Sequence, residues 1–205
     1  MAYSVKELFY SLQGEGANTG RAAVFCRFSG CNLWSGREED RALADCDFCD
    51  TDFVGGDKFA DVGSLAQAVE DLWPRGGGQR LVILTGGEPG LQVDTGLVNA
   101  LRKRRFEVAI ETNGTVDLPA GISWVCVSPK GRMDLKITEG DELKLVFPQT
   151  GVDPARFADL AFDHLFLQPK AGADEQQNTV LAMDYCRAHP QWRLSLQTHK
   201  LLGIR

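Results

Sequence analysis

The chain has 205 residues, a length typical of one domain, and 43% of them are hydrophobic, which is enough to form a core. Its formal net charge of −6 argues against broad nucleic-acid binding, because proteins that bind nucleic acid in this way usually present a basic patch. A membrane protein is not expected, since no stretch of about 18 apolar residues occurs and residues 1–16 lack the pattern of a signal peptide. We therefore expect a cytoplasmic protein that binds neither membranes nor nucleic acid.

Short apolar segments alternate along the chain with segments of helical periodicity. In chain order, we expect strands at 5–10, 23–28, 80–84, 106–110, 124–127, 142–147, 164–167 and 192–196. Helices are expected at 61–73, 94–105, 153–160 and 175–189, and the charged segment 35–45 can form a further short helix. This order of elements is typical of α/β proteins with a parallel sheet.

Polar and glycine-rich residues gather where the predicted strands end. Thr85-Gly-Gly-Glu-Pro89 follows one strand, and Glu111-Thr-Asn-Gly114 follows the next. In parallel α/β folds the functional site lies at these carboxyl ends. A complete eight-unit barrel needs about 250 residues, and some connections here leave no room for a helix. We therefore expect an α/β fold, an open partial (β/α) barrel of about six parallel strands with few helices, as one domain over residues 1–205.

Three of the six cysteines form the pattern Cys-x14-Cys-x2-Cys, at Cys31, Cys46 and Cys49. In a reducing compartment, clustered cysteines indicate metal or redox chemistry rather than disulfides. Three thiolates suit either zinc or an iron–sulfur cluster. Structural zinc takes four protein ligands, and the nearest spare thiol, Cys26, lies in a predicted strand. A [4Fe–4S] cluster held by three cysteines would leave one iron open to a cofactor, so both metals remain possible at this point.

Three further features have two interpretations each on local sequence alone. Gln13-Gly-Glu-Gly16 is either a plain hairpin turn or a turn that displays two polar side chains. Arg27 lies in an apolar strand, where its guanidinium either reaches solvent or points into a polar cavity. Asp50, Thr51 and Asp52 follow the last cysteine of the pattern; such residues are typical of turns, and their oxygen atoms are also ligands that Mg²⁺ prefers.

The three cysteines and Thr85-Gly-Gly-Glu-Pro89 together resemble the radical S-adenosylmethionine superfamily. Its enzymes bind a [4Fe–4S] cluster through three cysteines, the methionine part of S-adenosylmethionine chelates the fourth iron, and a Gly-Gly-Glu-Pro-like strand end contacts the amino group.

The usual spacing in this superfamily is Cys-x3-Cys-x2-Cys, and the longer first gap in this chain points to one subgroup. End to end, the chain resembles the 7-carboxy-7-deazaguanine synthase family, which includes members with this expanded loop. The segments that carry the resemblance are Phe9-Tyr-Ser-Leu-Gln-Gly-Glu-Gly16, Phe25-Cys-Arg-Phe28, Gly30-Cys-Asn-Leu-Trp34, Cys46-x2-Cys-Asp-Thr-Asp52, Thr85-Gly-Gly-Glu-Pro89, Glu111-Thr-Asn-Gly114, Ser128-Pro-Lys130 and Gln197-Thr-His-Lys200.

This resemblance implies an enzyme, a carbon–nitrogen lyase. It would contract the ring of 6-carboxy-5,6,7,8-tetrahydropterin to give 7-carboxy-7-deazaguanine and ammonia, in 7-deazaguanine and queuosine biosynthesis. The reduced cluster would cleave S-adenosylmethionine to a 5′-deoxyadenosyl radical, which takes hydrogen from C6 of the pterin and later receives it back, so that the cofactor is used catalytically. The implied cofactors are the [4Fe–4S] cluster, S-adenosylmethionine and Mg²⁺. No side chain is expected to act as a conventional catalytic acid or base.

The same resemblance implies a role for each matching residue. Cys31, Cys46 and Cys49 would bind the cluster, and Thr51 would bind Mg²⁺. The residues implied to contact S-adenosylmethionine are Phe48, Cys49, Asp50, Gly86, Gly87, Glu88, Glu111, Ser128, Pro129, Lys130 and Gln168, with Glu111 at the ribose hydroxyls. The residues implied to contact the pterin are Leu12, Gln13, Gly14, Glu15, Arg27, Thr85, His199 and Arg205, of which Arg27 and His199 would hold its carboxylate.

The resemblance also implies a homodimer that receives electrons from a flavodoxin-like or other donor. Two alternative functions compete with it. A radical activase that installs a glycyl radical on a partner protein shares the cluster motif, but it does not explain why Gln13-Gly-Glu-Gly16, Arg27 and His199 would meet at a small acid. A zinc-stabilised binding module predicts a colourless, oxygen-stable protein, whereas a brown protein containing iron and sulfide indicates the radical enzyme.

Overall fold

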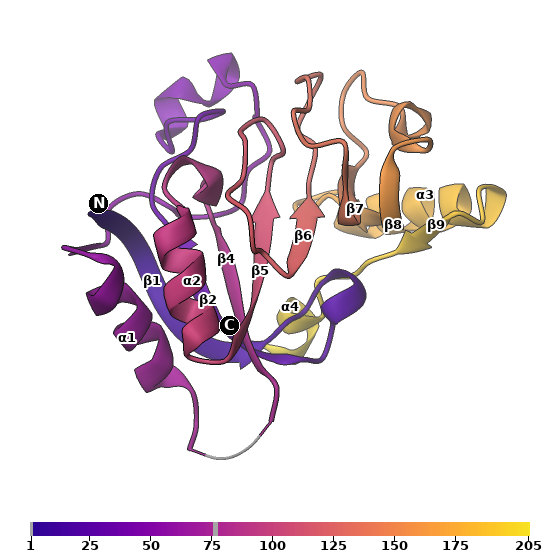
Figure 1. Cartoon of the computed structure of the whole chain (residues 1–205). Coiled ribbons are helices and arrows are strands. Elements are labelled where there is room, and N and C mark those ends of the chain that lie inside the picture. Colours follow the sequence, from indigo (N-terminus) through magenta and orange to yellow (C-terminus); the bar gives the residue numbers. More distant parts are fainter. Residues whose placement is uncertain (1, 76–77) are drawn as a thin grey trace.

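A computed structural model describes residues 2–75 and 78–205, and within them one nine-stranded sheet forms the centre of the fold (Figure 1). The strands lie in the order β3-β1-β2-β4-β5-β6-β7-β8-β9. All neighbours from β2 to β9 are parallel, which makes seven parallel strands, whereas β1 is antiparallel to both β2 and β3. The bounds are β1 (Tyr3–Leu12), β2 (Ala22–Phe28), β3 (Asp57–Phe59), β4 (Arg80–Gly86), β5 (Phe106–Thr112), β6 (Trp124–Val127), β7 (Glu139–Phe147), β8 (Ala161–Pro169) and β9 (Trp192–Leu194).

The run of parallel strands confirms the predicted α/β architecture, an open partial barrel with few helices. The antiparallel edge follows from chain length, because residues 13–21 between β1 and β2 are too few for the crossover of about a dozen residues that a parallel pair needs. Strand β3 is absent from the sequence-based prediction. It has three residues, and its sequence Asp57-Lys-Phe59 is too short to show periodicity. It is defined by pairing with Tyr3–Val5, a non-local contact.

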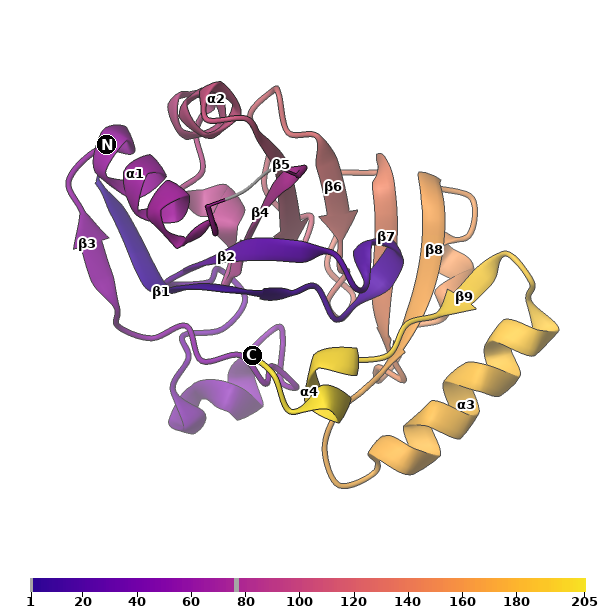
Figure 2. The same cartoon turned by 90° about the horizontal axis from the view of Figure 1, so that it is seen from below.

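Three longer helices pack on the sheet: α1 (Val62–Leu72), α2 (Thr95–Lys103) and α3 (Glu175–Ala188). Helices α1 and α2 lie side by side over the N-terminal half of the sheet, whereas α3 packs on β8 and β9 (Figure 2). Asp61 caps α1 in a reciprocal capping box with Ser64, and Asp94 caps α2 by accepting from the Leu97 amide. Among the residues described, no helix combines the length and apolar character needed to cross a bilayer.

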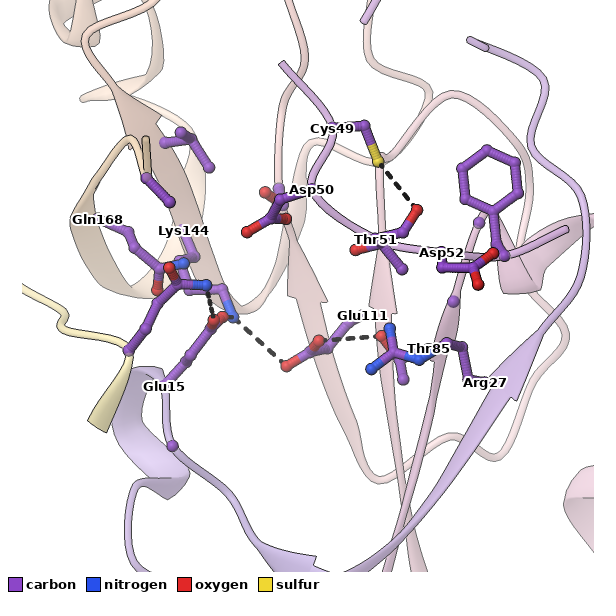
Figure 3. Close-up of a pocket in the computed structure, with 18 of the residues that line it drawn as sticks. Glu15, Arg27, Cys49, Asp50, Thr51, Asp52, Thr85, Glu111, Lys144 and Gln168 are labelled. Carbon is purple, nitrogen blue, oxygen red and sulfur yellow. Dashed lines mark hydrogen bonds and ion pairs between the residues drawn. The ribbon is translucent and has the colours of Figure 1, made fainter. Parts of the chain in front are cut away.

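Side chains alternate between the two faces of each strand, and this alternation separates the core from the site. Leu84 of β4 and Ile110 of β5 are fully buried in the core cluster that includes residues of α1 and α2. Leu145 of β7 belongs to a second cluster that includes residues of α3. The other face carries polar residues at or near the carboxyl ends of the strands, namely Arg27, Thr85, Glu111, Lys144 and Gln168 (Figure 3).

Some predicted boundaries were wrong. The helix predicted at 153–160 is a short 3-10 turn, and the strand predicted at 192–196 ends at Leu194. The chain then forms the short helix α4 (Thr198–Leu202), because the Thr198 amide donates to the Gly14 carbonyl at 2.9 Å and so ties this segment to the turn after β1. The 3-10 helices are η1 (Gly16–Asn18), η2 (Glu38–Leu43, in the segment where a short helix was expected), η3 (Pro89–Leu91) and η4 (Pro154–Phe157).

Candidate active site

A cavity of about 580 Å³ opens at the carboxyl ends of the parallel strands (Figure 3). This volume is typical of small-molecule and cofactor sites, which span roughly 300–1,000 Å³. Its wall is built from the strand ends, the cysteine loop and the segment around α4. The predicted site residues that line it are Leu12, Gln13, Gly14, Glu15, Arg27, Cys31, Cys46, Phe48, Cys49, Asp50, Thr51, Thr85, Gly86, Gly87, Glu111, Ser128, Lys130, Gln168, His199 and Arg205.

Two predicted site residues, Glu88 and Pro129, are not part of the lining. The carboxylate of Glu88 is fully buried and accepts hydrogen bonds from the Gly90 amide at 2.8 Å, the Thr112 hydroxyl at 2.7 Å and the Asn113 amide at 2.7 Å. Burial raises the pKa of Glu88, and these three donors oppose the shift. Glu88 thus joins the ends of β4 and β5, and its predicted contact with S-adenosylmethionine stays a prediction.

The three cysteines of the Cys-x14-Cys-x2-Cys pattern meet at the cavity, whereas Cys26 is fully buried in the core. A hydrogen bond from Cys46 lowers the pKa of Cys49 to about 6, and the same bond raises the pKa of Cys46. Burial raises the pKa of Cys31.

The number of thiols at the cavity suits a [4Fe–4S] cluster better than structural zinc. Among the described residues, no group of three or more histidine, cysteine, aspartate or glutamate side chains is close enough to hold one metal ion. Structural zinc takes four protein ligands around one ion. A [4Fe–4S] cluster is bound by cysteine thiolates, one to each iron, so that three cysteines leave the fourth iron without a protein ligand. Three cysteines around an open cavity therefore fit a [4Fe–4S] cluster with one iron free of protein ligands.

The long gap between Cys31 and Cys46 folds as a compact insert. The guanidinium of Arg41 lies 4.2 Å from the ring centroid of Trp34 and donates hydrogen bonds to the backbone carbonyls of Asp47 at 3.0 Å and Cys49 at 3.1 Å. Arg41 therefore connects the insert to the Cys46–Cys49 turn. Sequence reasoning missed this residue, since a charged stretch in a loop gives no signal of which arginine folds back.

A buried ion-pair network forms the floor of the cavity. Lys144 lies 2.5 Å from Glu15 and 3.3 Å from Glu111, and Glu111 also accepts from Thr85 at 3.1 Å and from Gln13 at 2.9 Å. Burial alone would raise the pKa of Glu15, but the cation and hydrogen bond of Lys144 outweigh this and lower it to about 2. The sequence analysis did not identify Lys144, although a lysine within the apolar strand at 142–147 was a usable signal.

The opposite side of the cavity carries cations. Arg27 donates to Glu7 at 2.8 Å, and Arg205 pairs with the same carboxylate while its guanidinium lies 4.8 Å from the ring centroid of Phe9. His199 of α4 also lines the cavity, but it lies against Gly14, on the side of Glu15. The structure thus brings Arg27 and Arg205, which are far apart in the sequence, to one carboxylate, that of Glu7.

The remaining wall joins the cysteine loop to β6 and α4. The ammonium of Lys130 lies 5.8 Å from the ring centroid of Phe48 and donates to the Ser128 hydroxyl. Lys200 of α4 reaches Asp50 at 2.9 Å. Aromatic, hydroxyl and carboxylate groups are thereby placed beside the cysteines, in an arrangement that suits a nucleoside-bearing cofactor.

Comparisons with known proteins place this site in a family. A model of the radical S-adenosylmethionine superfamily matches residues 43–131. Proteins of Caulobacter vibrioides and Bordetella pertussis, both named 7-carboxy-7-deazaguanine synthase, are 59% and 60% identical to the chain, with full coverage of both sequences in each case. The chain belongs to the 7-carboxy-7-deazaguanine synthase family.

A solved structure agrees with this membership. The crystal structure of QueE from Escherichia coli superposes with a TM-score of 0.69 at 27% identity, covering 96% of this chain and 94% of that one. The predicted family and the radical S-adenosylmethionine type of fold are both confirmed. As a radical S-adenosylmethionine enzyme, a 7-carboxy-7-deazaguanine synthase uses a [4Fe–4S] cluster and S-adenosylmethionine.

Proposed function

We propose that this protein catalyses the ring contraction of 6-carboxy-5,6,7,8-tetrahydropterin to 7-carboxy-7-deazaguanine, with release of ammonia, in queuosine biosynthesis. The names of full-length relatives and the superfamily match support this reaction. The observation that carries the proposal is one cavity in which Cys31, Cys46 and Cys49 face the same space as Arg27 and Glu15. Thiolates suited to a cluster therefore lie beside cationic and anionic groups suited to a small molecule that carries a carboxylate and N–H donors.

In this proposal Cys31, Cys46 and Cys49 hold the cluster. When bound, the cluster and S-adenosylmethionine supply the radical that removes and returns a hydrogen atom of the substrate. The chain positions the reactants: the backbone at Gly86 and Gly87 permits close approach of the cofactor, because neither residue has a side chain. Phe48, Ser128, Lys130 and Gln168 complete the proposed cofactor wall, and Glu111 is assigned to the ribose hydroxyls.

The substrate's carboxylate is assigned to Arg27 and His199, with Arg205 nearby. A guanidinium donates charge-assisted hydrogen bonds to a carboxylate. The ring is assigned to the Leu12–Glu15 segment and to Thr85, which lie across the cavity floor. Helix α4 is tied to this side of the cavity, since the amide and hydroxyl of Thr198 both donate to the Gly14 carbonyl at 2.9 Å.

Mg²⁺ is assigned to Thr51. Hard cations prefer oxygen ligands, and Thr51 lines the cavity between Asp50 and Asp52. The carboxylates of these two residues pair with Lys200 at 2.9 Å and Lys6 at 2.7 Å, so they are held at the edge of the site. We further propose that the chain acts as a single domain within a homodimer and takes electrons from a flavodoxin-like or other donor.

An anaerobic turnover assay tests the proposed reaction. Reconstituted protein receives S-adenosylmethionine, a reductant, Mg²⁺ and 6-carboxytetrahydropterin, and products are identified by mass spectrometry. We expect a product lighter by one ammonia and no net consumption of S-adenosylmethionine. Cys31→Ala should lose both product formation and bound iron, whereas Cys186→Ala, which alters a partly exposed cysteine outside the cavity, should retain both.

Two results would overturn the proposal at different levels. Cleavage of S-adenosylmethionine without a pterin product would retain a radical enzyme and reject this substrate. A colourless wild-type protein that binds no iron after reconstitution would reject the radical chemistry itself.

A further inference from the structure

Lys144 is a buried cation at the floor of the cavity, and no role in the reaction follows for it from the family motifs. Its side chain is only 5% exposed. Its ammonium contacts two carboxylates that come from separate parts of the chain, Glu15 in the turn after β1 and Glu111 at the end of β5. Glu15 also accepts a hydrogen bond from the Gln197 amide at 2.9 Å.

The charges of this group do not balance. One ammonium faces two carboxylates, so that the floor of the cavity carries an excess negative charge away from bulk water. A buried charge without a partner is costly, and a ligand that supplies N–H donors or positive charge compensates it. Glu15 uses one hydrogen bond at each of its oxygens, which leaves lone pairs free to accept from a ligand.

The other side of the cavity has the opposite character. Figure 3 shows Glu15 and Lys144 on one side, Glu111 in the middle, and Thr85 with Arg27 on the far side. A ligand with an anionic end and an N–H-rich end fits this polarity in one orientation only. The pterin assigned above has both: a carboxylate at C6, and adjacent N2–H and N3–H donors whose spacing resembles that of a guanidinium and suits a bidentate contact with a carboxylate.

We propose that Lys144 is a positioning residue that keeps Glu15 ionised and oriented, so that Glu15 accepts the N–H edge of the pterin's aminopyrimidinone ring. This inference rests on the proposed function. Lys144 thereby sets the orientation of the substrate, with the ring at Glu15 and the carboxylate at Arg27. The specificity that follows is for 2-amino-4-oxo-pyrimidine rings, because a ring without these adjacent donors would leave Glu15 unpaired.

Removing the ammonium of Lys144 should change the protonation state of Glu15 at the floor of the cavity. The charged groups near Lys144 are Glu15, Glu111, Glu142 and Cys126, and His199 also faces Glu15. Without Lys144, no ammonium would stand between the carboxylates of Glu15 and Glu111. Desolvation and mutual repulsion would then favour a proton on Glu15, and this would turn one of its acceptor oxygens into a donor.

The test measures binding of two stable probes, pterin-6-carboxylate and unsubstituted pterin, to cluster-loaded protein with S-adenosylmethionine by titration calorimetry. Lys144→Met should weaken both probes by similar factors, on the order of 10- to 100-fold, because both contain the same ring. Arg27→Gln should weaken only pterin-6-carboxylate. The matched control is Lys136→Met, which removes a lysine that is 57% exposed and should leave both affinities unchanged.

A pH profile separates positioning from a general structural effect. In Lys144→Met, affinity should recover as pH rises from about 5 to about 7.5, because Glu15 then loses the proton that it gains when the cation is removed, while the probe keeps its N3–H; the wild type should show no such recovery. Lys144→Arg should restore much of the binding at neutral pH. Glu15→Gln leaves the cation in place and should show a loss that does not recover with pH, so it tests the proposal even where Lys144→Met fails to fold.

The outcomes separate this inference from the proposed function. Any of three results would overturn the role of Lys144. They are affinities of Lys144→Met within about twofold of the wild type, a loss of affinity confined to pterin-6-carboxylate, and a loss of affinity that does not depend on pH. Wild-type turnover alongside any of these results leaves the proposed function standing. Wild-type binding without turnover rejects the proposed function and leaves the role of Lys144 intact, and a wild type that binds neither probe rejects both.

Discussion

The guanidinium of Arg41 donates a hydrogen bond to the backbone carbonyl of Cys49, at 3.1 Å, from within the fourteen-residue gap that separates Cys31 from Cys46. The stacking of the same group on Trp34, 4.2 Å from the ring centroid, fixes its direction. The expanded gap is therefore not a loose loop. It supplies a side chain that holds the last two cysteines of the pattern in place.

Replacing Arg41 should weaken retention of the cluster. Groups that hold metal ligands in place typically contribute 10- to 100-fold in metal affinity. We therefore expect Arg41→Ala to lose its iron at a chelator concentration roughly 10- to 100-fold lower than the concentration that the wild type requires. Iron and sulfide per chain, measured after a chelator series, check this. Arg37→Ala is the matched control, because Arg37 is 72% exposed and its ion pair with Glu39 is long, at 4.0 Å. Equal iron release by the two variants would rule out this role.

Thr51 should govern the response to Mg²⁺ without affecting the cluster. Thr51→Ala removes a hydroxyl ligand, so the Mg²⁺ concentration for half-maximal turnover should rise about tenfold, as expected for a lost ligand contact of about 1.4 kcal/mol. Thr51→Ser keeps the hydroxyl and serves as the control. Bound iron and reductive cleavage of S-adenosylmethionine without pterin should match the wild type. An unchanged Mg²⁺ response in Thr51→Ala would remove Thr51 from the proposed metal site.

The parts of the fold that local sequence determines were predictable. The strand expected at 80–84 lies within β4 (Arg80–Gly86), and the polar residues expected at its carboxyl end line the cavity at Thr85 and Gly86. Apolar alternation and a following glycine-rich turn are short-range signals, and they are sufficient here. Strand β3 and helix α4 were not predicted. Each is held by contacts with the N-terminal segment, from which it is far away in the sequence.

The same limit explains the site residues that sequence reasoning missed. Lys144 is 129 residues from Glu15 and 33 from Glu111, and no local pattern shows that β7 brings it between them. Glu88 shows the converse: its motif was recognised, but its carboxylate is directed into the protein by donors on β5 and the residue after it. Burial and long-range partners, which decide both cases, are properties of the assembled sheet.

Glu88→Gln should destabilise the protein. The carboxylate of Glu88 accepts three hydrogen bonds, and a glutamine places an NH₂ group against donors at Gly90, Thr112 or Asn113. Leaving a buried donor unsatisfied costs roughly 1–3 kcal/mol, and this loss should be visible in chemical unfolding of the cluster-free protein. Glu139→Gln, at an exposed position of β7, should change the unfolding free energy by less than about 0.5 kcal/mol. Equal stability of the two variants would contradict the tie between β4 and β5.

The ionised state of Glu15 should be visible in acid unfolding. Burial alone would raise the pKa of Glu15, but its partners, chiefly the charge and hydrogen bond of Lys144, lower the pKa to about 2 in the folded protein against an ordinary value of 4.5. Because the folded-state pKa is the lower one, the ionised carboxylate contributes stability above about pH 4.5, and this contribution is lost as the pH falls towards 2. At most about 3–4 kcal/mol is involved, since each unit of pKa difference corresponds to about 1.4 kcal/mol.

Comparison with Glu15→Gln isolates this contribution from the other carboxylates. Urea unfolding of the cluster-free wild type between pH 6 and 3 should show a steeper fall in unfolding free energy than Glu15→Gln, whose side chain does not titrate. Asp134→Asn is the matched control: Asp134 is fully exposed, and removal of its ion pair with Arg156 should leave the slope unchanged. Parallel pH curves for the wild type and Glu15→Gln would mean that Glu15 is not held ionised by Lys144, and the acidic floor of the cavity would then lose its electrostatic basis.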